Sequence, residues 1–258
     1  MPKNLKLISW NVNGIRAAWR HGFLDYLDNG YDLVAVQETK VHDPDILPTE
    51  LKNPAGYHTY WHSGEKKGYS GVAVFSKIKP RRVKTNFGRQ SLLSQEGRVI
   101  ELEFADFVFL NIYFPNGGSS EERLNYKLEF YRQFFTYIKK LDRAGKKIIF
   151  TGDLNTAHHE IDIARPKENI NNSGFMPKER IWLDKFAQAG FIDTFRDLAP
   201  KKVKYSYWDM KTRARDRNVG WRIDYFYVNR RMRDRVVRAN IQDEVLGSDH
   251  APVYLSIN

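Results

Sequence analysis

Short apolar runs rich in β-branched residues recur along the whole chain, and they constrain its fold more than any other feature. Runs of this kind, bounded by turn residues, are typical of β-strands. Eight of them are LKLIS, DLVAVQ, GVAVFS, RVIELEF, FVFLNIYF, KKIIFT, DYFYV and VYLSI. Helical patterns are fewer, so the strands cannot all belong to βαβ units of one parallel sheet. We therefore expect an α/β fold in which two sheets pack face to face with helices outside.

Three segments have features of helices. Between residues 121 and 141, apolar residues recur at intervals of 4, 3, 4 and 3 behind a capping box that begins at Ser119. A second helix is expected to begin at Pro177, because proline suits the first helical position, and to end near Gly190. A third helix is expected over residues 17–27.

Length and composition exclude several classes of protein. The 258 residues suit one domain that spans residues 1–258, and the absence of cysteine excludes disulfides, thiolate catalysis and cysteine-based zinc sites. No run approaches the ~20 apolar residues that span a bilayer. The first residues enter a strand pattern without the apolar core of a signal peptide. We therefore expect a cytoplasmic protein with no membrane partner.

The charge of the chain is positive and unevenly distributed. Lys and Arg exceed Asp and Glu by 42 to 31, which gives a formal charge of +11. Residues 201–238 contain 13 basic and 4 acidic residues, so this segment alone contributes +9. A local surplus of this size is typical of a surface that binds a polyanion. Aromatic residues that could stack on bases are interleaved with it, namely Tyr205, Tyr207, Trp208 and Trp221. Because the segment has no amphipathic helical period, nucleic acid is favoured over a membrane.

Polar side chains occur where the apolar runs begin or end, and in one case inside a run. The residues concerned are Asn11, Glu38, Tyr113, Asn116, Asp153, Asn155, Asp224, Asp249 and His250. One polar strand end alone is typical of a turn or a helix cap. Six strands that share the pattern predict side chains that converge on one site. Two of the ends, LKLISWNVNG and KKIIFTGDLNTA, are similar, which suggests two related halves that meet there.

Asp224 is the most informative of these residues, because an ionised carboxylate inside an aromatic strand is costly unless it is paired. His250 is the natural partner, since a carboxylate orients imidazole and favours its protonated form. Of the seven histidines, it is the one beside other candidate site residues. His158 and His159 lack the spacing of metal ligands and are expected to be loop residues.

The residue types narrow the chemistry. There is no Walker loop and no G-x-G-x-x-G, so no nucleotide cofactor is expected, and GYSGV lacks the second glycine of a nucleophile elbow. Carboxylates, carboxamides and one histidine form an oxygen-rich set suited to Mg²⁺ or Mn²⁺. A hard cation, a general base and a basic aromatic surface together predict phosphodiester hydrolysis.

The motifs also resemble a known family. In chain order they are SWNVNGIRA, QETK, KGYSGVAVFSK, EGRVIELEF, NIYFPNG, RLNYKLEFY, GDLNTAHHEID, NNSGFMPKER, NVGWRIDYFYVN and GSDHAP. Together they are similar to those of exonuclease III type apurinic/apyrimidinic (AP) endonucleases, in the superfamily that includes DNase I and inositol polyphosphate phosphatases. The resemblance implies a DNase I-like four-layer sandwich of two mixed sheets flanked by helices.

The resemblance also implies roles for the residues of the site. A Mg²⁺ ion, for which Mn²⁺ can substitute, would be bound by Glu38 and lie close to Asn11, Asp153, Asn155 and Asp249. Asp153 would activate water with the help of Asn155, while Tyr113 and Asn116 would bind phosphate and His250, held by Asp224, would stabilise its charge. Contacts with phosphate or DNA are expected for Arg98, Asn116, Asn155, Arg215, Arg217 and Asn218. Tyr207, Trp221 and Ile223 would form the pocket for an abasic sugar.

The predicted function is therefore that of a metal-dependent DNA-repair nuclease. It would cleave duplex DNA 5′ to abasic sites, leave a 3′ hydroxyl, and remove nucleotides or blocking groups from 3′ ends, as a monomer. One alternative is a phosphoesterase for inositol phosphates or lipids, which would not need the basic aromatic segment. Another is a catalytically silent DNA-binding module, which would be expected to have lost at least one acidic or histidine residue of the site. Asn13, where some relatives have a metal-binding Asp, leaves the number of metal ions open.

Overall fold

The computed structural model describes residues 4–87 and 95–258, and its strands form two six-stranded sheets. The first sheet has the order β11-β12-β1-β2-β4-β3 and the second has the order β5-β6-β7-β8-β10-β9. The strands of the first sheet are β1 (Leu5–Asn11), β2 (Leu33–Gln37), β3 (His58–His62), β4 (Val72–Ser76), β11 (Val236–Ile241) and β12 (Val253–Ile257). Those of the second are β5 (Arg82–Lys84), β6 (Val99–Glu103), β7 (Val108–Tyr113), β8 (Ile148–Asp153), β9 (Phe191–Asp193) and β10 (Asp224–Asn229).

Both sheets are mixed and have the same pattern of pairing. Each contains one parallel pair at its centre, β1 with β2 and β7 with β8, and its other neighbouring strands are antiparallel. The eight predicted strands are confirmed. The sequence did not predict β3, β5, β9 and β11, which are the edge strands of the two sheets.

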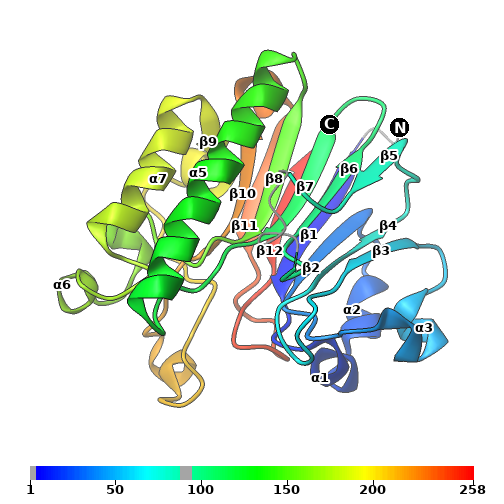
Figure 1. Ribbon diagram of the computed structural model, residues 1–258, viewed down its shortest axis with the longest axis horizontal. Helices are drawn as coiled ribbons and strands as arrows, with labels where there is room; N and C mark the ends of the chain where they lie inside the picture. The colour runs from blue at the N-terminus through cyan, green and yellow to red at the C-terminus, as the bar shows by residue number, and fades with distance from the viewer. Residues whose placement is uncertain (1–3, 88–94) are drawn as a thin grey trace.

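The molecule has four layers, as predicted (Figure 1). The helices α5 (Glu121–Arg143) and α7 (Pro177–Gln188) cover the second sheet, and α1 (Ile15–Arg20) and α2 (Phe23–Leu27) lie beside the first. Side chains from both sheets, such as Leu7 and Val74 from the first and Phe109 and Phe226 from the second, form one buried core between them. Burial of this apolar surface holds the sheets together and thereby fixes which strand ends face each other.

The predicted helices are confirmed with two differences in detail. The hydroxyl of Ser120, not that of Ser119, caps α5 by accepting the backbone N–H of Arg123 at 3.2 Å. The helix predicted over residues 17–27 is two short helices, because Gly22 between them has a left-handed backbone (φ 87°) that interrupts the helical hydrogen bonds.

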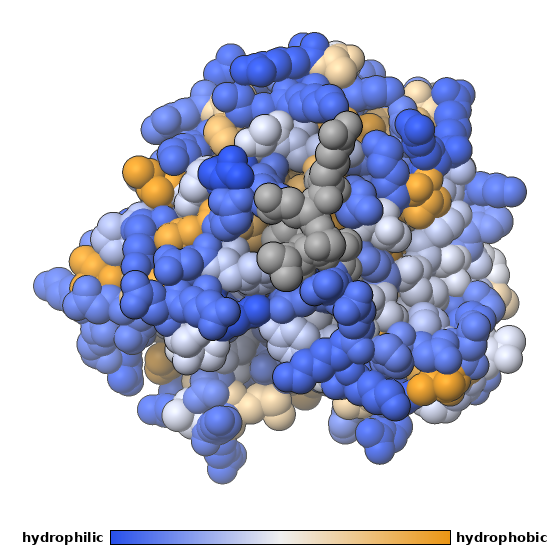
Figure 2. Space-filling view, in the orientation of Figure 1, coloured by the Kyte–Doolittle hydropathy of each residue, from blue (hydrophilic) through white to orange (hydrophobic). Residues whose placement is uncertain are grey.

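Shorter elements complete the fold. They are η1 (Pro44–Ile46), α3 (Thr49–Lys52), η2 (Glu160–Asp162), α6 (Pro166–Asn169), α8 (Thr194–Leu198), η3 (Ala214–Arg217) and η4 (Arg230–Arg235). The face of the molecule shown in Figure 2 is mostly hydrophilic, and its hydrophobic side chains form small separate groups. Within residues 4–87 and 95–258, none of the helices has the length and apolar character needed to cross a membrane.

Candidate active site

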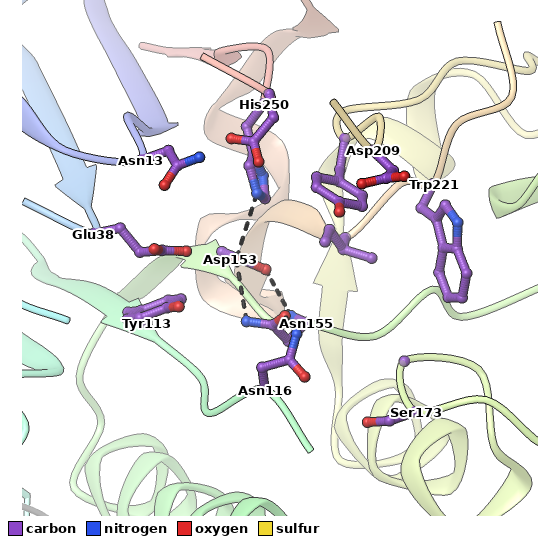
Figure 3. Close-up of a pocket in the computed structure, with 14 residues that line it drawn as sticks. Asn13, Glu38, Tyr113, Asn116, Asp153, Asn155, Ser173, Asp209, Trp221 and His250 are labelled. Carbon is purple, nitrogen blue, oxygen red and sulfur yellow. Dashed lines mark hydrogen bonds and ion pairs between the residues drawn. The ribbon is translucent and has the colours of Figure 1, made fainter. Parts of the chain in front are cut away.

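The predicted strand ends meet at one edge of the two-sheet core. The central parallel strands β1, β2, β7 and β8 all end there, and the antiparallel strand β10 begins there with Asp224. A cleft of about 420 Å³ opens at this edge. It is lined by Asn13, Glu38, Tyr113, Asn116, Asp153, Asn155, Ser173, Gly174, Tyr207, Asp209, Trp221, Ile223, Asp249 and His250. The sequence-predicted convergence of separate strands on one site is therefore observed, and ten of these residues are labelled in Figure 3.

Two of the strand ends have the same local structure. In Asn11-Val12-Asn13 the Asn11 side chain accepts the Asn13 N–H at 3.0 Å, and Asp153 accepts the Asn155 N–H at 2.7 Å in the same way. Asn13 and Asn155 both have left-handed backbones, with φ of 48° and 51°. Such conformations are uncommon outside glycine, and Asn is among the residues that adopt them most easily. The similarity of the two sequence segments thus corresponds to two equivalent strand–turn units, one from each sheet.

Glu38, Asp153 and His250 are brought together at the centre of the cleft (Figure 3). One possible ligand atom from each lies within 4.8 Å of the others. The side-chain amide of Asn11 donates to both carboxylates, at 2.9 Å from Glu38 and 3.0 Å from Asp153. Burial would raise the pKa of Glu38, but the bond from Asn11 and the charge of Lys40 outweigh it and lower that pKa. Glu38 is therefore ionised at neutral pH.

The arrangement of ligand atoms fits a hard divalent cation. Two carboxylates that share one amide donor offer oxygen atoms around a common point, which is the environment Mg²⁺ and Mn²⁺ prefer. His250 is less suited to bind metal, because the Asp224 carboxylate that lies 2.8 Å from its Nδ1 favours the protonated imidazole, in which Nε2 carries a hydrogen and has no free lone pair. Asn11 faces the carboxylates with its NH₂ group, since its Oδ1 accepts the Asn13 N–H. Asp249 lines the cleft, but it is not in the close group that the described residues form.

Asp224 and His250 form the buried pair that the sequence predicted. The Asp224 carboxylate also accepts the Ser206 hydroxyl at 2.7 Å, and its side chain is fully buried. Burial would lower the pKa of His250, but the charge of Asp224 and the hydrogen bond to it raise that pKa to about 10. The imidazole is therefore protonated at neutral pH, with Nε2 turned toward Asp153 at 4.0 Å. An N–H donor with a positive charge thus faces the cleft.

Asp153 and its neighbours form the wall of the cleft that faces His250. Burial, followed by the nearby charge of Asp224, raises the pKa of Asp153 to about 7. The Asn155 side chain donates to Asp153 at 3.2 Å and to the Phe114 carbonyl at 2.9 Å, and its oxygen accepts from Asn116 at 3.2 Å. A carboxylate that is held in place and whose pKa is near neutrality is suited to accept a proton.

The aromatic part of the cleft is smaller than the sequence indicated. Tyr207, Trp221 and Ile223 line it as predicted, and the Tyr207 ring lies 4.8 Å from the imidazole of His250. Tyr205 and Trp208, which the sequence analysis grouped with them, are 7% and 3% exposed and belong to the hydrophobic core. Those two rings are therefore not available for stacking on bases.

Arg98 and Arg215, which were expected to contact DNA, both donate hydrogen bonds within the protein. Arg98 is 1% exposed, and it donates to Glu96 at 2.6 Å and to the Tyr113 carbonyl at 3.0 Å. Arg215 is half-buried and donates at 2.6 Å to the carbonyls of both Asp243 and Val245. The prediction was wrong for Arg98, whose guanidinium is neutralised in the interior, and Arg215 supports the turn that leads to His250. Arg217 and Asn218, which were also predicted to contact DNA, are both exposed.

The basic segment 201–238 does not form one surface, contrary to expectation. Strand β10 runs from Asp224 at the cleft to Asn229 at the far end, and the arginines of η4 follow that far end. Arg231 pairs there with Asp142 at 2.6 Å, and Arg222 is buried. The exposed basic residues that precede β10 are Lys201, Lys202, Lys211, Arg213 and Arg217. The arginines of η4 are therefore separated from the cleft by the length of β10.

Several residues of the site were not assigned a role from the sequence. Lys40 lies 3.3 Å from Glu38, and Asp209, Ser173 and Gly174 line the cleft. Asn13, noted in the sequence only as a position where some relatives have a metal-binding Asp, lines the cleft as well. Lys40 could have been found, because it stands in QETK two residues after Glu38 and also contacts the side chain of Asn13. Asp209 and Ser173 lie in loops, and no pattern in their segments distinguishes them from solvent-facing polar residues.

Comparison with known proteins shows where the chain belongs. Residues 8–250 match the Endonuclease/Exonuclease/phosphatase family. The chain is a member of this family. One of its relatives, an exodeoxyribonuclease of Bacillus subtilis (strain 168), is 46% identical to it over 98% of this chain and 100% of the relative's own length. The DNA repair nuclease APEX1 of Danio rerio is 39% identical over 98% of this chain and 82% of its own.

Solved structures agree with the family assignment. An AP endonuclease from Archaeoglobus fulgidus has a TM-score of 0.88 and 29% identity, with 98% of this chain and 99% of that one covered. A 3′-5′ exonuclease from Neisseria meningitidis has a TM-score of 0.89 and 26% identity, with 98% and 100% covered. The resemblance of this Endonuclease/Exonuclease/phosphatase protein to exonuclease III type AP endonucleases, predicted from its motifs, is confirmed.

Proposed function

We propose that the chain is a Mg²⁺-dependent DNA-repair nuclease that hydrolyses the phosphodiester 5′ to abasic sites in duplex DNA and leaves a 3′ hydroxyl. The observation that carries this proposal is the meeting of Glu38, Asp153 and the protonated His250 in one cleft that continues into an aromatic pocket. The names of the relatives, which include an exodeoxyribonuclease and a DNA-(apurinic or apyrimidinic site) endonuclease, support the same activity.

Proton transfer and charge stabilisation can be assigned to separate residues. The Asp153 carboxylate accepts a proton from the attacking water, and Asn155 keeps that carboxylate oriented through its backbone and side-chain N–H groups. On the other side of the cleft, the Nε2–H of His250 donates to a phosphate oxygen as negative charge grows on it. Asp224 keeps the imidazole protonated and fixes its orientation.

Glu38 and Asp153 are proposed to hold the divalent cation, with Asn11 orienting both carboxylates. When bound, Mg²⁺, or Mn²⁺ in its place, supplies Lewis-acid stabilisation of the phosphate charge. Tyr113 lines the same cleft as Glu38, and its phenol helps to lower the pKa of that carboxyl, so it can orient this ligand and contact the phosphate. Asn116, on the exposed rim, is proposed to bind the phosphate together with Asn155.

Selection of the substrate is assigned to the pocket formed by Tyr207, Trp221 and Ile223. Gly174 closes its wall: a methyl group at this glycine would come within 3.1 Å of the Trp221 ring and 3.2 Å of the Asn155 carbonyl. A narrow aromatic pocket accepts a sugar that has lost its base more readily than a complete nucleotide, and an abasic site is also easier to extrude from the helix. We propose that 3′ ends enter the same cleft, and that the protein acts as a monomer.

The test is cleavage of a labelled duplex that contains one tetrahydrofuran abasic analogue, with Mg²⁺ or with EDTA. The expected result is one cut 5′ to the analogue that requires the cation, and little cutting of the same duplex with an intact nucleotide there. A duplex left whole in Mg²⁺ and in Mn²⁺ would reject the proposal. Cutting at the intact site at an equal rate would reject the role of the pocket but not nuclease activity.

A further inference from the structure

Arg98 packs against Tyr113, an aromatic residue that lines the cleft together with Glu38. The Arg98 guanidinium carbon is 4.6 Å from the centre of the Tyr113 ring, and the guanidinium donates to the Tyr113 carbonyl at 3.0 Å. The Tyr113 N–H in turn donates to the Arg98 carbonyl at 2.9 Å. One arginine therefore contacts the ring and the backbone of this tyrosine at the same time. A planar cation over the face of an aromatic ring attracts it and restricts its orientation.

The position of Arg98 is itself fixed. Its side chain is 1% exposed, and Glu96 neutralises it through a 2.6 Å ion pair. Next to it, Gly97 has a left-handed backbone (φ 59°), and a Cβ there would come within 2.4 Å of the carbonyl carbon of Ser63. Only glycine fits so close to a neighbouring backbone. The arginine is therefore held by its ion pair and by close packing, and it can transmit that rigidity to Tyr113.

A second arginine in the same network provides a comparison. Arg123 also binds Glu96, at 2.8 Å, and donates to the Tyr69 hydroxyl at 2.8 Å, which Arg98 contacts at 3.1 Å. The aromatic ring that Arg123 covers is that of Tyr126, at 4.6 Å. The two arginines thus share an acidic partner and a tyrosine hydroxyl, but their contacts with Tyr113 differ.

We propose that Arg98 is a positioning residue for the hydrolysis: it holds the Tyr113 ring so that the phenol hydroxyl meets Glu38 and the substrate phosphate. The inference rests on the proposed function, because it assigns Tyr113 to that reaction. Arg98 does not reach the cleft and acts only through Tyr113. Its removal should therefore affect turnover more than substrate binding, and only while the Tyr113 hydroxyl is present.

The experiment is a double-mutant cycle on the full chain with the tetrahydrofuran duplex and Mg²⁺. Arg98→Met is expected to lower kcat by about 10-fold, because Arg98 is in direct contact with Tyr113 and residues in contact are energetically coupled. KM should change by less than about threefold, because Arg98 does not line the cleft. In a Tyr113→Phe background, the same substitution should cost less than about twofold in kcat. Arg123→Met is the matched control and should leave kcat within about twofold of the wild type.

A second readout does not depend on turnover. With ¹³C-labelled tyrosine, the Tyr113 ring is expected to flip faster in Arg98→Met than in the wild type, and to be unchanged in Arg123→Met. Arg98→Lys keeps the charge beside Glu96 but has no planar face. It replaces Arg98→Met in this measurement if the methionine variant does not fold, and the Tyr113 ring should flip faster in it as well.

The inference would be overturned if Arg98→Met lowered kcat equally in the wild-type and the Tyr113→Phe backgrounds. It would also be overturned if Arg123→Met lowered kcat as much as Arg98→Met does. Failure of both Arg98 variants to fold would overturn it as well, because Arg98 would then be required for folding. If the wild type does not cut the duplex, the proposed function fails, while the ring measurement still decides whether Arg98 positions Tyr113.

Discussion

The side-chain amide of Asn11 donates to the Asp153 carboxylate at 3.0 Å, and these two residues end corresponding central strands of the two sheets. Each is followed by one spacer and an asparagine with a left-handed backbone. The contact therefore joins the two halves of the sandwich at their most similar points. Because it forms only when the sheets are packed in this register, the geometry of the site depends on the core between them.

Asp153→Asn should abolish most turnover without loss of substrate affinity. The carboxamide keeps the shape of the side chain but cannot accept a proton from water, so we expect kcat to fall by about 10²–10⁴. Cleavage assays would measure kcat, and fluorescence anisotropy in EDTA would measure the affinity for abasic duplex. Asp106→Asn, an exposed change next to the opposite end of β7, is the control. Turnover of Asp153→Asn within threefold of wild type would exclude Asp153 as the base.

Asp224→Asn tests the charge behind His250. The Asp224 carboxylate raises the pKa of His250, so its neutralisation should lower that pKa and leave less imidazolium at pH 8. We expect turnover at pH 8 to fall by about 10–100-fold. NMR titration of His250 in EDTA would follow the pKa. Ser206→Ala removes a neutral donor to the same carboxylate and should have a smaller effect. An unchanged His250 pKa in Asp224→Asn would contradict the assignment.

The sequence predicts the interior strands well, because strands such as β2, β4 and β8 are buried on both faces and consist of apolar runs. The edge strands β3 and β5 have no such run, and all of their residues are exposed or only partly buried. Their pairing depends on neighbours distant in sequence. The division of the predicted helix 17–27 at Gly22 likewise depends on residues distant in sequence, because both short helices pack on the first sheet.

For the site, the strand-end residues were predictable because six strands share the pattern, and because a carboxylate inside an aromatic strand, as at Asp224, is costly unless it is paired. The internal roles of Arg98 and Trp208 were not predictable from the sequence. Residue type does not show that the charge of Arg98 is neutralised inside the protein or that the Trp208 ring is buried in the core. Glu96 is only two residues from Arg98, yet their pairing depends on how residues 95–98 pack against Tyr69 and Tyr113. Long-range packing decides such cases.

Salt dependence would locate the DNA-binding surface. If Lys211 and Arg217 each contact one phosphate, Lys211→Gln and Arg217→Gln should each reduce the slope of log Kd against log salt concentration by about 0.9. Arg231→Gln removes the same charge from the same sequence segment, but beyond the far end of β10, and should leave the slope unchanged. Anisotropy titrations between about 50 and 200 mM salt would measure the slopes. An equal effect of all three substitutions would show that net charge, not a defined surface, determines binding.

The buried cluster around Asp162 makes a prediction about stability and pH. Arg222 forms two bonds to the Asp162 carboxylate, at 2.8 and 3.0 Å, and Arg196 forms a third contact. Burial would raise the pKa of Asp162, but the charges of these arginines outweigh it and hold that pKa well below the ordinary value. Because the folded pKa is the lower one, the stabilisation is complete above the unfolded pKa of about 3.9 and is lost as the pH falls below it.

Asp162→Asn should therefore lower the free energy of unfolding by about 3 kcal/mol at pH 7, since it removes the carboxylate that the buried Arg222 and the partly buried Arg196 share. The difference from wild type should shrink as the pH falls below about 4, where the unfolded wild-type chain gains a proton at this residue. Urea unfolding followed by circular dichroism at several pH values would measure it, with Asp106→Asn as the control for an exposed carboxylate. A difference that stays constant from pH 7 to pH 3, or grows toward low pH, would mean that packing and not charge accounts for the effect of Asp162.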